Sequence, residues 1–325
     1  MEANNRYLVI INPASGTMSK RKILPTICRK LDKIGIPYDV VGTRYPGHAT
    51  ELAAQAAAEG RPAVLACRGD GTVNEVAQGL IGTETVLGII PAGSGNGFAR
   101  HLGIPVDVSS ALNVIAANKV VVSDYGTANG RPFFCTFGVG FDAAVSERCA
   151  RSKRRGLLMY IHTMLNECVK FRPEEYIIEA GGRVITEKAF LVVCCNASQY
   201  GNNAFVAPDA SVTDGELDIT IVHGGDLLSR AVVGVDIVAG LIGKDAFSET
   251  IRTDSAKIIR NTPGAAHIDG ESITMPEIIE VQCHKGELRV FGATESTRFV
   301  PFATPTRLFL RDIYYSVRNI FAHDK

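Results

Sequence analysis

Along roughly the first 120 residues, short apolar runs alternate with segments whose apolar residues recur at helical spacing. The apolar runs end in turn-forming residues and are typical of buried strands. Predicted strands lie at 6–13, 38–43, 62–66 and 86–91, and predicted helices at 20–34, 49–59, from about Val73, and at 97–103. Strands that alternate with helices form parallel sheets with right-handed crossovers. We therefore expect residues 1–123 to form an α/β domain.

After about Val122 the pattern changes to β-rich segments separated by turns. Strand patterns occupy 131–140, 176–182, 183–197, 216–225, 255–260, 266–271 and 278–292. Helical stretches at 142–170 and 226–243 interrupt them. This pattern of strands separated by turns predicts a second, mainly antiparallel sandwich domain over residues 124–297, with the functional site in the cleft between the two domains.

The tail carries a third kind of pattern. Leu310, Ile313, Tyr314, Val317 and Phe321 fall on one face of a predicted helix. Given its aromatic residues, we expect the tail, about residues 298–325, to pack back on the first domain. Contact with a membrane through Arg307, Arg311 and Arg318 is the alternative.

Composition narrows the class of protein. Lys plus Arg and Asp plus Glu both number 34, so no basic excess indicates a nucleic-acid partner. No apolar run approaches the length of about 18 residues that spans a bilayer. The longest, 231–243, contains Asp236 and predicts a buried helix. The N-terminus enters a strand pattern without a basic segment, so a secretory signal is not expected.

The eight cysteines show no CxxC spacing, and Cys67, Cys135, Cys194 and Cys195 lie in strand-like runs. This pattern favours buried, reduced thiols over a zinc site or a disulfide framework. Reduced thiols are typical of a cytoplasmic protein.

Two glycine-rich stretches, "CRGDGTVNE" at 67–75 and "PAGSGNGFAR" at 91–100, each follow a predicted strand. Glycine lets the backbone approach a ligand closely, and ligands of α/β proteins collect at strand ends. A carboxylate at Asp70 would repel phosphates unless a divalent cation joins them. Asp70 is then a metal or water ligand, Thr72 and the loop amides contact phosphate, and Asn74 and Glu75 support the loop. An ordinary Asp-Gly turn is the alternative. In either case we expect the glycines to keep the loop intact without the Asp70 carboxylate.

Six motifs occur in a fixed order: "NPASG" at 12–16, "GDGTVNE" at 69–75, "PAGSGNGFAR" at 91–100, "GVGFDA" at 138–143, "APDASVTDGELDI" at 207–219 and "IDGE" at 268–271. Together they resemble the diacylglycerol kinase and sphingosine kinase catalytic family, including the bacterial soluble lipid kinases. The resemblance extends from about residue 6 to residue 293.

The resemblance implies a set of nucleotide-binding residues: Asn12, Pro13, Ala14, Ser15, Gly16, Thr43, Gly69, Asp70, Gly71, Thr72, Val73, Asn74, Glu75 and Ser94. It also implies three catalytic residues. Asp70 and Asp124 match carboxylates that bind the catalytic magnesium through water, and Glu271 matches a general base.

A second, structural metal site is implied at Ser211, Asp214 and Glu216, the last through its carbonyl. Hard oxygen donors in a short turn suit such a cation, although "DGEL" also fits an ordinary hairpin turn. Two positions depart from the family pattern: Arg68 replaces a usual glycine, and Gly97 stands where bacterial members commonly have an aspartate. The second departure leaves the base open between Asp70 and Glu271.

The resemblance therefore implies an ATP-dependent, Mg²⁺-dependent lipid kinase that phosphorylates a hydroxyl of diacylglycerol or of a sphingoid-type lipid. Such an enzyme would be cytoplasmic and peripherally bound to the membrane that holds its substrate. A homodimer is left open. The alternatives are an NAD kinase-like phosphotransferase, which shares "GDGT", and a non-catalytic nucleotide- or lipid-binding relative.

Overall fold

The structure is a computed structural model that describes residues 5–13, 20–151, 157–243, 246–293 and 300–321. The chain forms two compact units. Unit 1 comprises residues 1–123, 286–298 and 306–325, and unit 2 comprises residues 124–285 and 299–305. Each unit has its own hydrophobic core.

Unit 1 is built on a parallel sheet. Its strands are β1 (Tyr7–Ile11), β2 (Tyr38–Gly42), β3 (Ala63–Arg68) and β4 (Val86–Pro91), in the order β4-β3-β1-β2, with the end of β15 (Ile278–Phe291) parallel to β4. All six residues of β3 are buried, as expected for a strand that helices cover on both faces. Because the pairs are parallel, the carboxyl ends of these strands meet at one edge.

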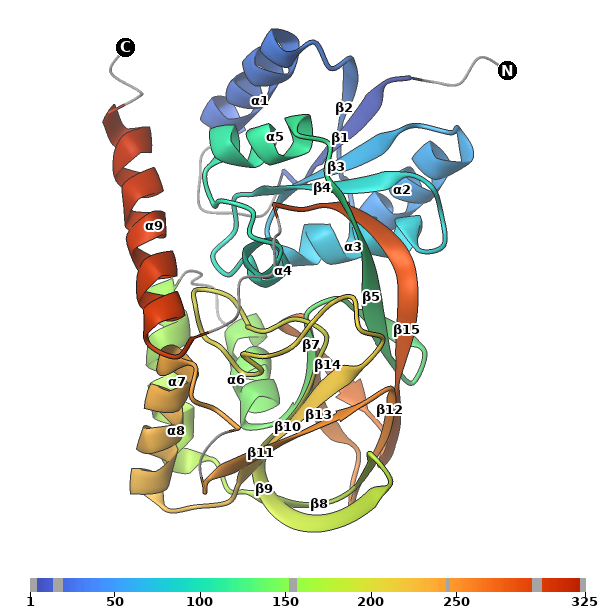
Figure 1. Ribbon diagram of the computed structural model, residues 1–325. Helices are drawn as coiled ribbons and strands as arrows, with labels where there is room; N and C mark the ends of the chain where they lie inside the picture. The colour runs from blue at the N-terminus through green and yellow to red at the C-terminus, as the bar shows by residue number, and fades with distance from the viewer. Residues whose placement is uncertain (1–4, 14–19, 152–156, 244–245, 294–299, 322–325) are drawn as a thin grey trace. The chain divides into compact units, whose positions relative to one another are not determined.

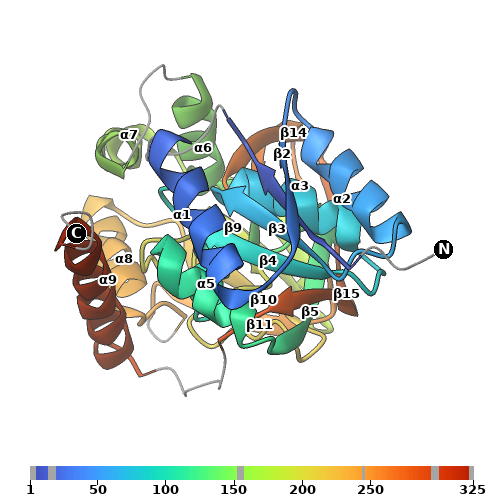
Figure 2. The ribbon, with the colours of Figure 1, turned by 90° about the horizontal axis from the view of Figure 1, so that it is seen from above.

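The unit 1 helices are α1 (Lys20–Ile34), α2 (His48–Ala58), α3 (Asp70–Leu80), α4 (Gly97–His101) and α5 (Val108–Ala116). Figure 2 shows α1 and α5 on one face of the parallel strands and α2 and α3 on the other. Ile23, Ile27 and Leu31 of α1 pack into the core at helical spacing. On the other face, Gly79 lets α3 approach α2, since a Cβ there would lie 2.4 Å from the carbonyl oxygen of Thr50.

Unit 2 is built mainly of antiparallel strands (Figure 1). They are β5 (Val120–Ala128), β6 (Arg131–Phe133), β7 (Thr136–Gly140), β8 (Glu174–Ala180), β9 (Arg183–Cys195), β10 (Leu217–His223), β11 (Ser248–Thr253), β12 (Ser255–Arg260), β13 (Gly264–Ile268), β14 (Glu271–Met275) and the first part of β15. The ladder β14-β13-β7-β9-β8-β12-β15 is antiparallel throughout. Helices α6 (Phe141–Arg151), α7 (Leu157–Lys170) and α8 (Leu227–Ala239) complete the unit.

These observations confirm the predicted fold class, a parallel α/β region followed by a β-rich antiparallel region. Several details differ from the prediction. Strand β11 was not predicted, and the predicted strand at 266–271 is divided by a turn into the end of β13 and the start of β14. Helix α3 begins at Asp70 rather than near Val73, because the extended Gly69 is its N-cap. Helix α5 was not predicted, although Asp107 gives a usable signal: its carboxylate accepts a hydrogen bond from the Ser110 N–H, as an N-cap does.

The predicted burial of residues 231–243 holds for one side of the helix only. Val233 and Ile242 are buried in a core cluster, and Ile237 packs against it. On the other side of α8 the side chains of Leu228, Val235 and Val238 are 73%, 63% and 63% exposed. Within the described part of the chain, no helix has both the length and the apolar content needed to cross a membrane.

The tail forms α9 (Ala303–Phe321), and its residues from Thr306 onward belong to unit 1. A partly buried ion pair between Arg100 and Asp312 ties the helix to that unit. Of the predicted apolar face, Leu310, Ile313 and Tyr314 are exposed, and the side chains of Val317 and Phe321 lie outside the described residues.

Candidate active site

Both glycine-rich loops of unit 1 lie at the carboxyl edge of the parallel sheet. Strands β3 and β4 are neighbours, with Arg68 opposite Pro91, so the loops that follow them start side by side. A Cβ on Gly93 would lie only 2.4 Å from Cα of Gly69. The two loops therefore touch through their backbones, which requires glycine at position 93.

Asp70 connects the two loops. Its Oδ2 accepts a hydrogen bond from the Asn96 N–H at 2.8 Å, and its Oδ1 accepts one from the Gly97 N–H at 2.9 Å. These bonds indicate that the loops depend on this carboxylate, contrary to the expectation that the glycines alone would keep their form. A carboxylate has about four lone-pair positions, so both oxygens can still accept a further hydrogen bond from a metal-bound water.

Asn96 is a site residue that the sequence did not single out. Its backbone is left-handed, with φ of 55°, and its side chain bonds both the N–H and the carbonyl of Gly93. An asparagine within a glycine-dense loop is a usable signal for such a turn. By holding Gly93 and presenting its own N–H to Asp70, Asn96 fixes the second loop.

Arg68 ends β3 with φ of 136°, a conformation that favours glycine, and only 2% of its surface is exposed. A non-glycine residue in this region stores backbone strain. The strain explains why glycine is usual at this position in the family pattern. Because this chain has arginine instead, a buried guanidinium lies in the loop next to Asp70.

The remaining nucleotide candidates surround the same edge. Asn12 and Pro13 follow β1, and Thr43 follows β2, where its N–H donates to the carbonyl of Ile11. The side chains of Thr72 and Val73 are buried, whereas Ser94 is exposed. Ala14, Ser15 and Gly16 lie outside the described residues.

Asn74 and Glu75 lie in the second turn of α3. Glu75 accepts a hydrogen bond from the Ala49 N–H at 3.1 Å, and its carbonyl accepts one from the Thr50 hydroxyl. Asn74 accepts a hydrogen bond from the Gln78 side chain. Glu75 thus ties α3 to the start of α2 and supports the loop from behind. Gly71 lies between Asp70 and Thr72 in the first turn of α3, whose N-terminus suits an anion.

In unit 2, the structure brings Asp124 together with the predicted structural metal residues. Asp124 is 1% exposed, and its Oδ2 accepts a hydrogen bond from the Gly215 N–H at 2.7 Å. Its own N–H donates to the carbonyl of Val212. Asp124 therefore anchors the turn that contains Ser211, Asp214 and Glu216.

The turn itself offers hard oxygen donors. Oδ1 of Asp214 accepts the Glu216 N–H, and Oγ of Ser211 accepts the Thr213 N–H. Burial raises the pKa of the Cys283 thiol to about 12, and the carboxylates of Asp124 and Asp214 add to the shift because they lie nearby. Among the residues that the structure describes, no three His, Cys, Asp or Glu side chains gather to hold a metal. The donors fit a largely hydrated magnesium ion, which accepts few protein ligands.

Glu271 is an exposed residue at the start of β14. The turn before it, Asp269–Gly270, has positive φ at both residues, as a two-residue hairpin requires. Asp269 was missed from the sequence: its carboxylate accepts the N–H groups of Phe134, Cys135 and Thr136 at 2.8–3.0 Å. The hairpin that presents Glu271 is thereby fixed to the segment between β6 and β7.

A buried cluster lies behind this hairpin. His267 on β13 and Tyr200 both contact Oδ2 of Asp142, at 2.8 Å each. Gly138 leaves room for the cluster, since a Cβ there would lie 2.3 Å from the Asp142 carboxylate. Thus "GVGFDA" and His267, the residue before "IDGE", lie far apart in the sequence and meet in one cluster.

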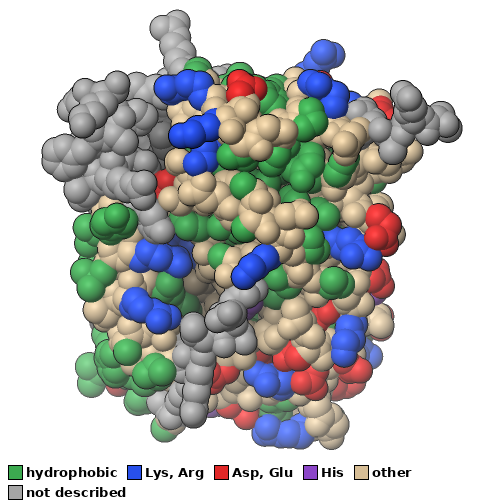
Figure 3. Space-filling model, turned by 45° about the horizontal axis from the view of Figure 1, so that its top comes forward, with side chains coloured by type: hydrophobic (Ala, Val, Ile, Leu, Met, Phe, Trp, Pro, Cys, Tyr) green, Lys and Arg blue, Asp and Glu red, His purple; other side chains and the backbone are tan. Residues whose placement is uncertain are grey.

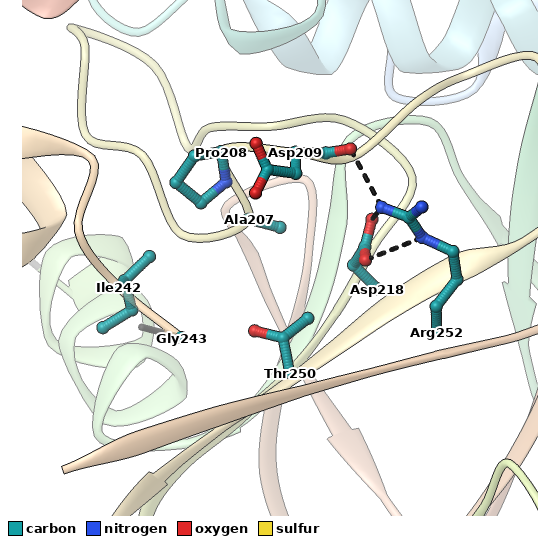
Figure 4. Close-up of a pocket in the computed structure, with 8 residues that line it drawn as sticks. All are labelled: Ala207, Pro208, Asp209, Asp218, Ile242, Gly243, Thr250 and Arg252. Atoms are coloured by element: carbon teal, nitrogen blue, oxygen red, sulfur yellow. Dashed lines mark hydrogen bonds and ion pairs between the residues drawn. The ribbon is translucent and has the colours of Figure 1, made fainter. Parts of the chain in front are cut away.

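A cavity of about 220 Å³ also lies in unit 2. Ala207, Pro208, Asp209, Asp218, Ile242, Gly243, Thr250 and Arg252 line it (Figure 4). Arg252 bonds the Asp218 carboxylate and the carbonyl of Asp209. Burial raises the pKa of the Asp218 carboxyl, while Arg252 opposes this shift. None of the predicted site residues lines this cavity.

Both units of the chain match models of known protein domains. Residues 6–128 match the model of the diacylglycerol kinase catalytic domain, and residues 135–292 match the YegS C-terminal NAD kinase beta sandwich-like domain. A diacylglycerol kinase of Mycobacterium tuberculosis (strain ATCC 25618 / H37Rv) is 31% identical over 226 residues, which cover 67% of this chain and 73% of that protein. The chain belongs to the diacylglycerol kinase family.

Two further proteins are similar to the chain, one in sequence and one in fold. An uncharacterized protein of Synechocystis, sll0036, is 30% identical over 252 residues, which cover 75% of this chain but only 58% of that protein. The crystal structure of a diacylglycerol kinase from Bacillus anthracis str. Sterne has a TM-score of 0.70 at 22% identity, covering 89% of this chain and 97% of that chain. The resemblance inferred from the six motifs is confirmed at the level of this family.

Proposed function

We propose that this protein is an ATP-dependent lipid kinase, which transfers the γ-phosphoryl group of ATP to a hydroxyl of diacylglycerol or of a sphingoid-type lipid. The observation that carries the proposal is the pair of glycine loops joined through Asp70 at the carboxyl edge of the unit 1 sheet. Membership of the diacylglycerol kinase family supports a lipid as the acceptor.

The nucleotide half of the proposal rests on backbone groups. Gly69 and Gly93 lack side chains where their loops touch, so the backbones of both loops lie together at this edge. The N-terminus of α3 adds a partial positive charge. We assign the nucleotide to this edge, with Asn12, Thr43 and Ser94 around it.

Magnesium, when bound, would neutralise charge on the transferred phosphoryl group. We assign Asp70 and Asp124 as the carboxylates that hold it through water. Both are anchored by backbone N–H groups, Asp70 by two and Asp124 by that of Gly215. Such anchoring fixes the direction in which each remaining lone pair points. The turn at Ser211, Asp214 and Glu216 is assigned to a second, structural ion.

Glu271 is assigned as the general base. As the acceptor hydroxyl attacks, a bond forms between its oxygen and the γ-phosphorus, the bond from that phosphorus to the β–γ bridging oxygen breaks, and ADP leaves. The hydroxyl proton passes to the Glu271 carboxylate. Asp70 is assigned to magnesium instead, because two backbone N–H groups hold its carboxylate in place, whereas Glu271 is exposed at the start of β14. Positioning and charge neutralisation supply most of the catalysis in phosphoryl transfer.

The test is transfer of label from γ-labelled ATP to a panel of acceptors in mixed micelles. Diacylglycerol, a sphingoid base, ceramide, NAD and a short soluble alcohol are compared at equal concentration, with and without Mg²⁺. Faster labelling of a lipid than of NAD or the alcohol supports the proposal. Faster labelling of NAD would replace it with an NAD kinase-like activity, and no labelling of any acceptor would indicate a non-catalytic relative. The Glu271→Gln variant is the matched control, with turnover lowered by about 10² or more if Glu271 is the base.

A further inference from the structure

Helix α8 in unit 2 exposes apolar side chains. Leu228, Val232, Val235 and Val238 are 73%, 36%, 63% and 63% exposed, and they recur at helical spacing along one side. Ala231 and Gly234, between them, are exposed as well. A surface helix normally turns polar residues outward. Among the described side chains within α8, every exposed one is apolar.

The polar residues of α8 point the other way. Asp236 is 7% exposed. The guanidinium of Arg230 stacks over the Phe190 ring, 5.0 Å from its centroid, and donates to the carbonyls of Cys168 and Phe171 at 2.8 and 3.0 Å. Burying charged groups is costly unless they are hydrogen-bonded or paired. The helix thus keeps its charged groups on the packed side, beside Val233, and leaves only apolar side chains exposed.

Phe302 extends the same apolar surface. Its N–H donates to the carbonyl of Ala239, the last residue of α8, and its side chain is 60% exposed. Its φ is 59°, which makes it a conformational outlier for a bulky residue. A strained backbone that turns an aromatic ring toward solvent indicates that the ring has a role outside the core.

Two exposed cations border this surface. The bonds from Arg230 to Cys168 and Phe171 hold the end of α7 against the first turns of α8. That end carries Lys170, and Arg172 follows it; both are exposed, and Val169 between them and Cys168 is 67% exposed. The one exposed acid of the adjoining α8 N-terminus is Asp226, whose carboxylate caps the helix through Ser229. Figure 3 shows hydrophobic side chains along the lower left edge, the side on which Figure 1 draws α8.

We propose that the α8 surface, defined as Leu228, Val232, Val235, Val238 and Phe302, inserts into the headgroup boundary of an anionic lipid bilayer, with Lys170 and Arg172 at the level of the phosphates. An apolar helix face beside basic residues is the chemistry of an interfacial helix, and cations near an anionic leaflet add to binding. The choice of a bilayer as partner rests on the proposed lipid kinase function. Binding itself requires neither ATP nor turnover.

The test is cosedimentation of the full chain, without ATP, with vesicles of phosphatidylcholine and with vesicles that also contain phosphatidylglycerol. The triple variant Leu228→Gln/Val235→Gln/Val238→Gln should bind the mixed vesicles at least about tenfold more weakly than wild type. Glutamine has a better helix propensity than valine, so the helix itself is not weakened. The matched control Val184→Gln/Ile278→Gln removes exposed apolar side chains elsewhere in unit 2 and should bind like wild type.

Two further variants separate the parts of the surface. Lys170→Gln/Arg172→Gln should reduce the preference for phosphatidylglycerol. Phe302→Gly should weaken binding while leaving the melting temperature equal or higher, because glycine relieves the strained φ. Wild-type binding by the triple variant, or no vesicle binding by wild type, would overturn the proposal. So would a wild-type dimer in sedimentation velocity that the triple variant converts to monomer, since the surface would then join two copies. A protein that binds vesicles but labels no acceptor would instead contradict only the kinase activity.

Discussion

Nε2 of His267 lies 2.8 Å from Oδ2 of Asp142, and both side chains are buried in unit 2. The Gly270 N–H points at Nδ1 of the same ring, at 3.4 Å, so Nδ1 is the acceptor and Nε2 carries the proton toward Asp142. The imidazole thereby connects the Asp142 carboxylate to the turn that precedes Glu271.

Asp142→Asn should destabilise the protein by about 3 kcal/mol. The carboxylate accepts hydrogen bonds from the Ala143 N–H, the Tyr200 hydroxyl and His267, and an asparagine amide group would face one of these donors with another donor. Urea unfolding measures the change. Asp254→Asn, at an exposed position in the same unit, should shift the midpoint little; equal losses in the two variants would contradict the cluster's role.

Arg68→Gly should be more stable than Arg68→Ala by about 1 kcal/mol. Both variants lose the buried guanidinium, but only glycine relieves the backbone at φ of 136°. Thermal unfolding of the two variants side by side isolates the backbone strain from the loss of the side chain. If alanine is as stable as glycine, the strain assigned to this position is absent.

Asp70→Asn should lose both stability and activity. An asparagine can accept only one of the two N–H groups that the carboxylate now holds, which costs about 1–3 kcal/mol. Turnover should fall to background in the γ-labelled ATP assay because the negative charge proposed to direct magnesium is lost. An unchanged melting curve would refute the structural role, whereas near-normal turnover would refute the catalytic one.

Acid should lower the free energy of unfolding of wild type more than that of His101→Gln. Burial lowers the pKa of His101 in α4 from its ordinary 6.5 to about 4. Between these values the unfolded chain binds a proton that the folded protein excludes, so the neutral imidazole's contribution is complete above about pH 6.5 and declines as the pH falls toward 4. Unfolding free energies at about pH 7 and pH 4.5 should show an extra loss in wild type on the order of 2 kcal/mol. Parallel losses would show that His101 is not the group responsible.

Magnesium should raise the melting temperature of wild type but not of Asp214→Ala. A cation that binds only the native state stabilises it by mass action, and Asp214 supplies the carboxylate of the proposed structural site. Differential scanning fluorimetry across a magnesium titration gives the measurement. Thr213→Ala, in the same turn, serves as the control that retains all three proposed ligands. An equal response in Asp214→Ala would remove Asp214 from the site.

The parts of the fold and site that the sequence predicted are those written in local patterns. The parallel sheet and the glycine loops follow from runs of neighbouring residues. Asp269 and the Asp142–His267 pair could not be found in this way, because their partners lie more than 120 residues away in the chain. The helix at 226–243 was predicted, but its exposed apolar side was not. An apolar pattern identifies one face of a helix and does not say whether another part of the protein covers that face.

The late position of β15 in the sequence affects how this protein folds during its synthesis on the ribosome. Leu87 of β4 pairs with Val290, and Phe291 belongs to the unit 1 core, so the first unit needs residues that are translated after nearly all of unit 2. Until then the β4 edge exposes unpaired backbone groups, the kind of edge that invites association with other chains. Multidomain chains generally fold from the N-terminus as they emerge. Here unit 1 is synthesised first, but it is completed only after nearly all of unit 2 has left the exit tunnel. The β4 edge therefore stays unpaired for much of synthesis, and chaperones can protect it.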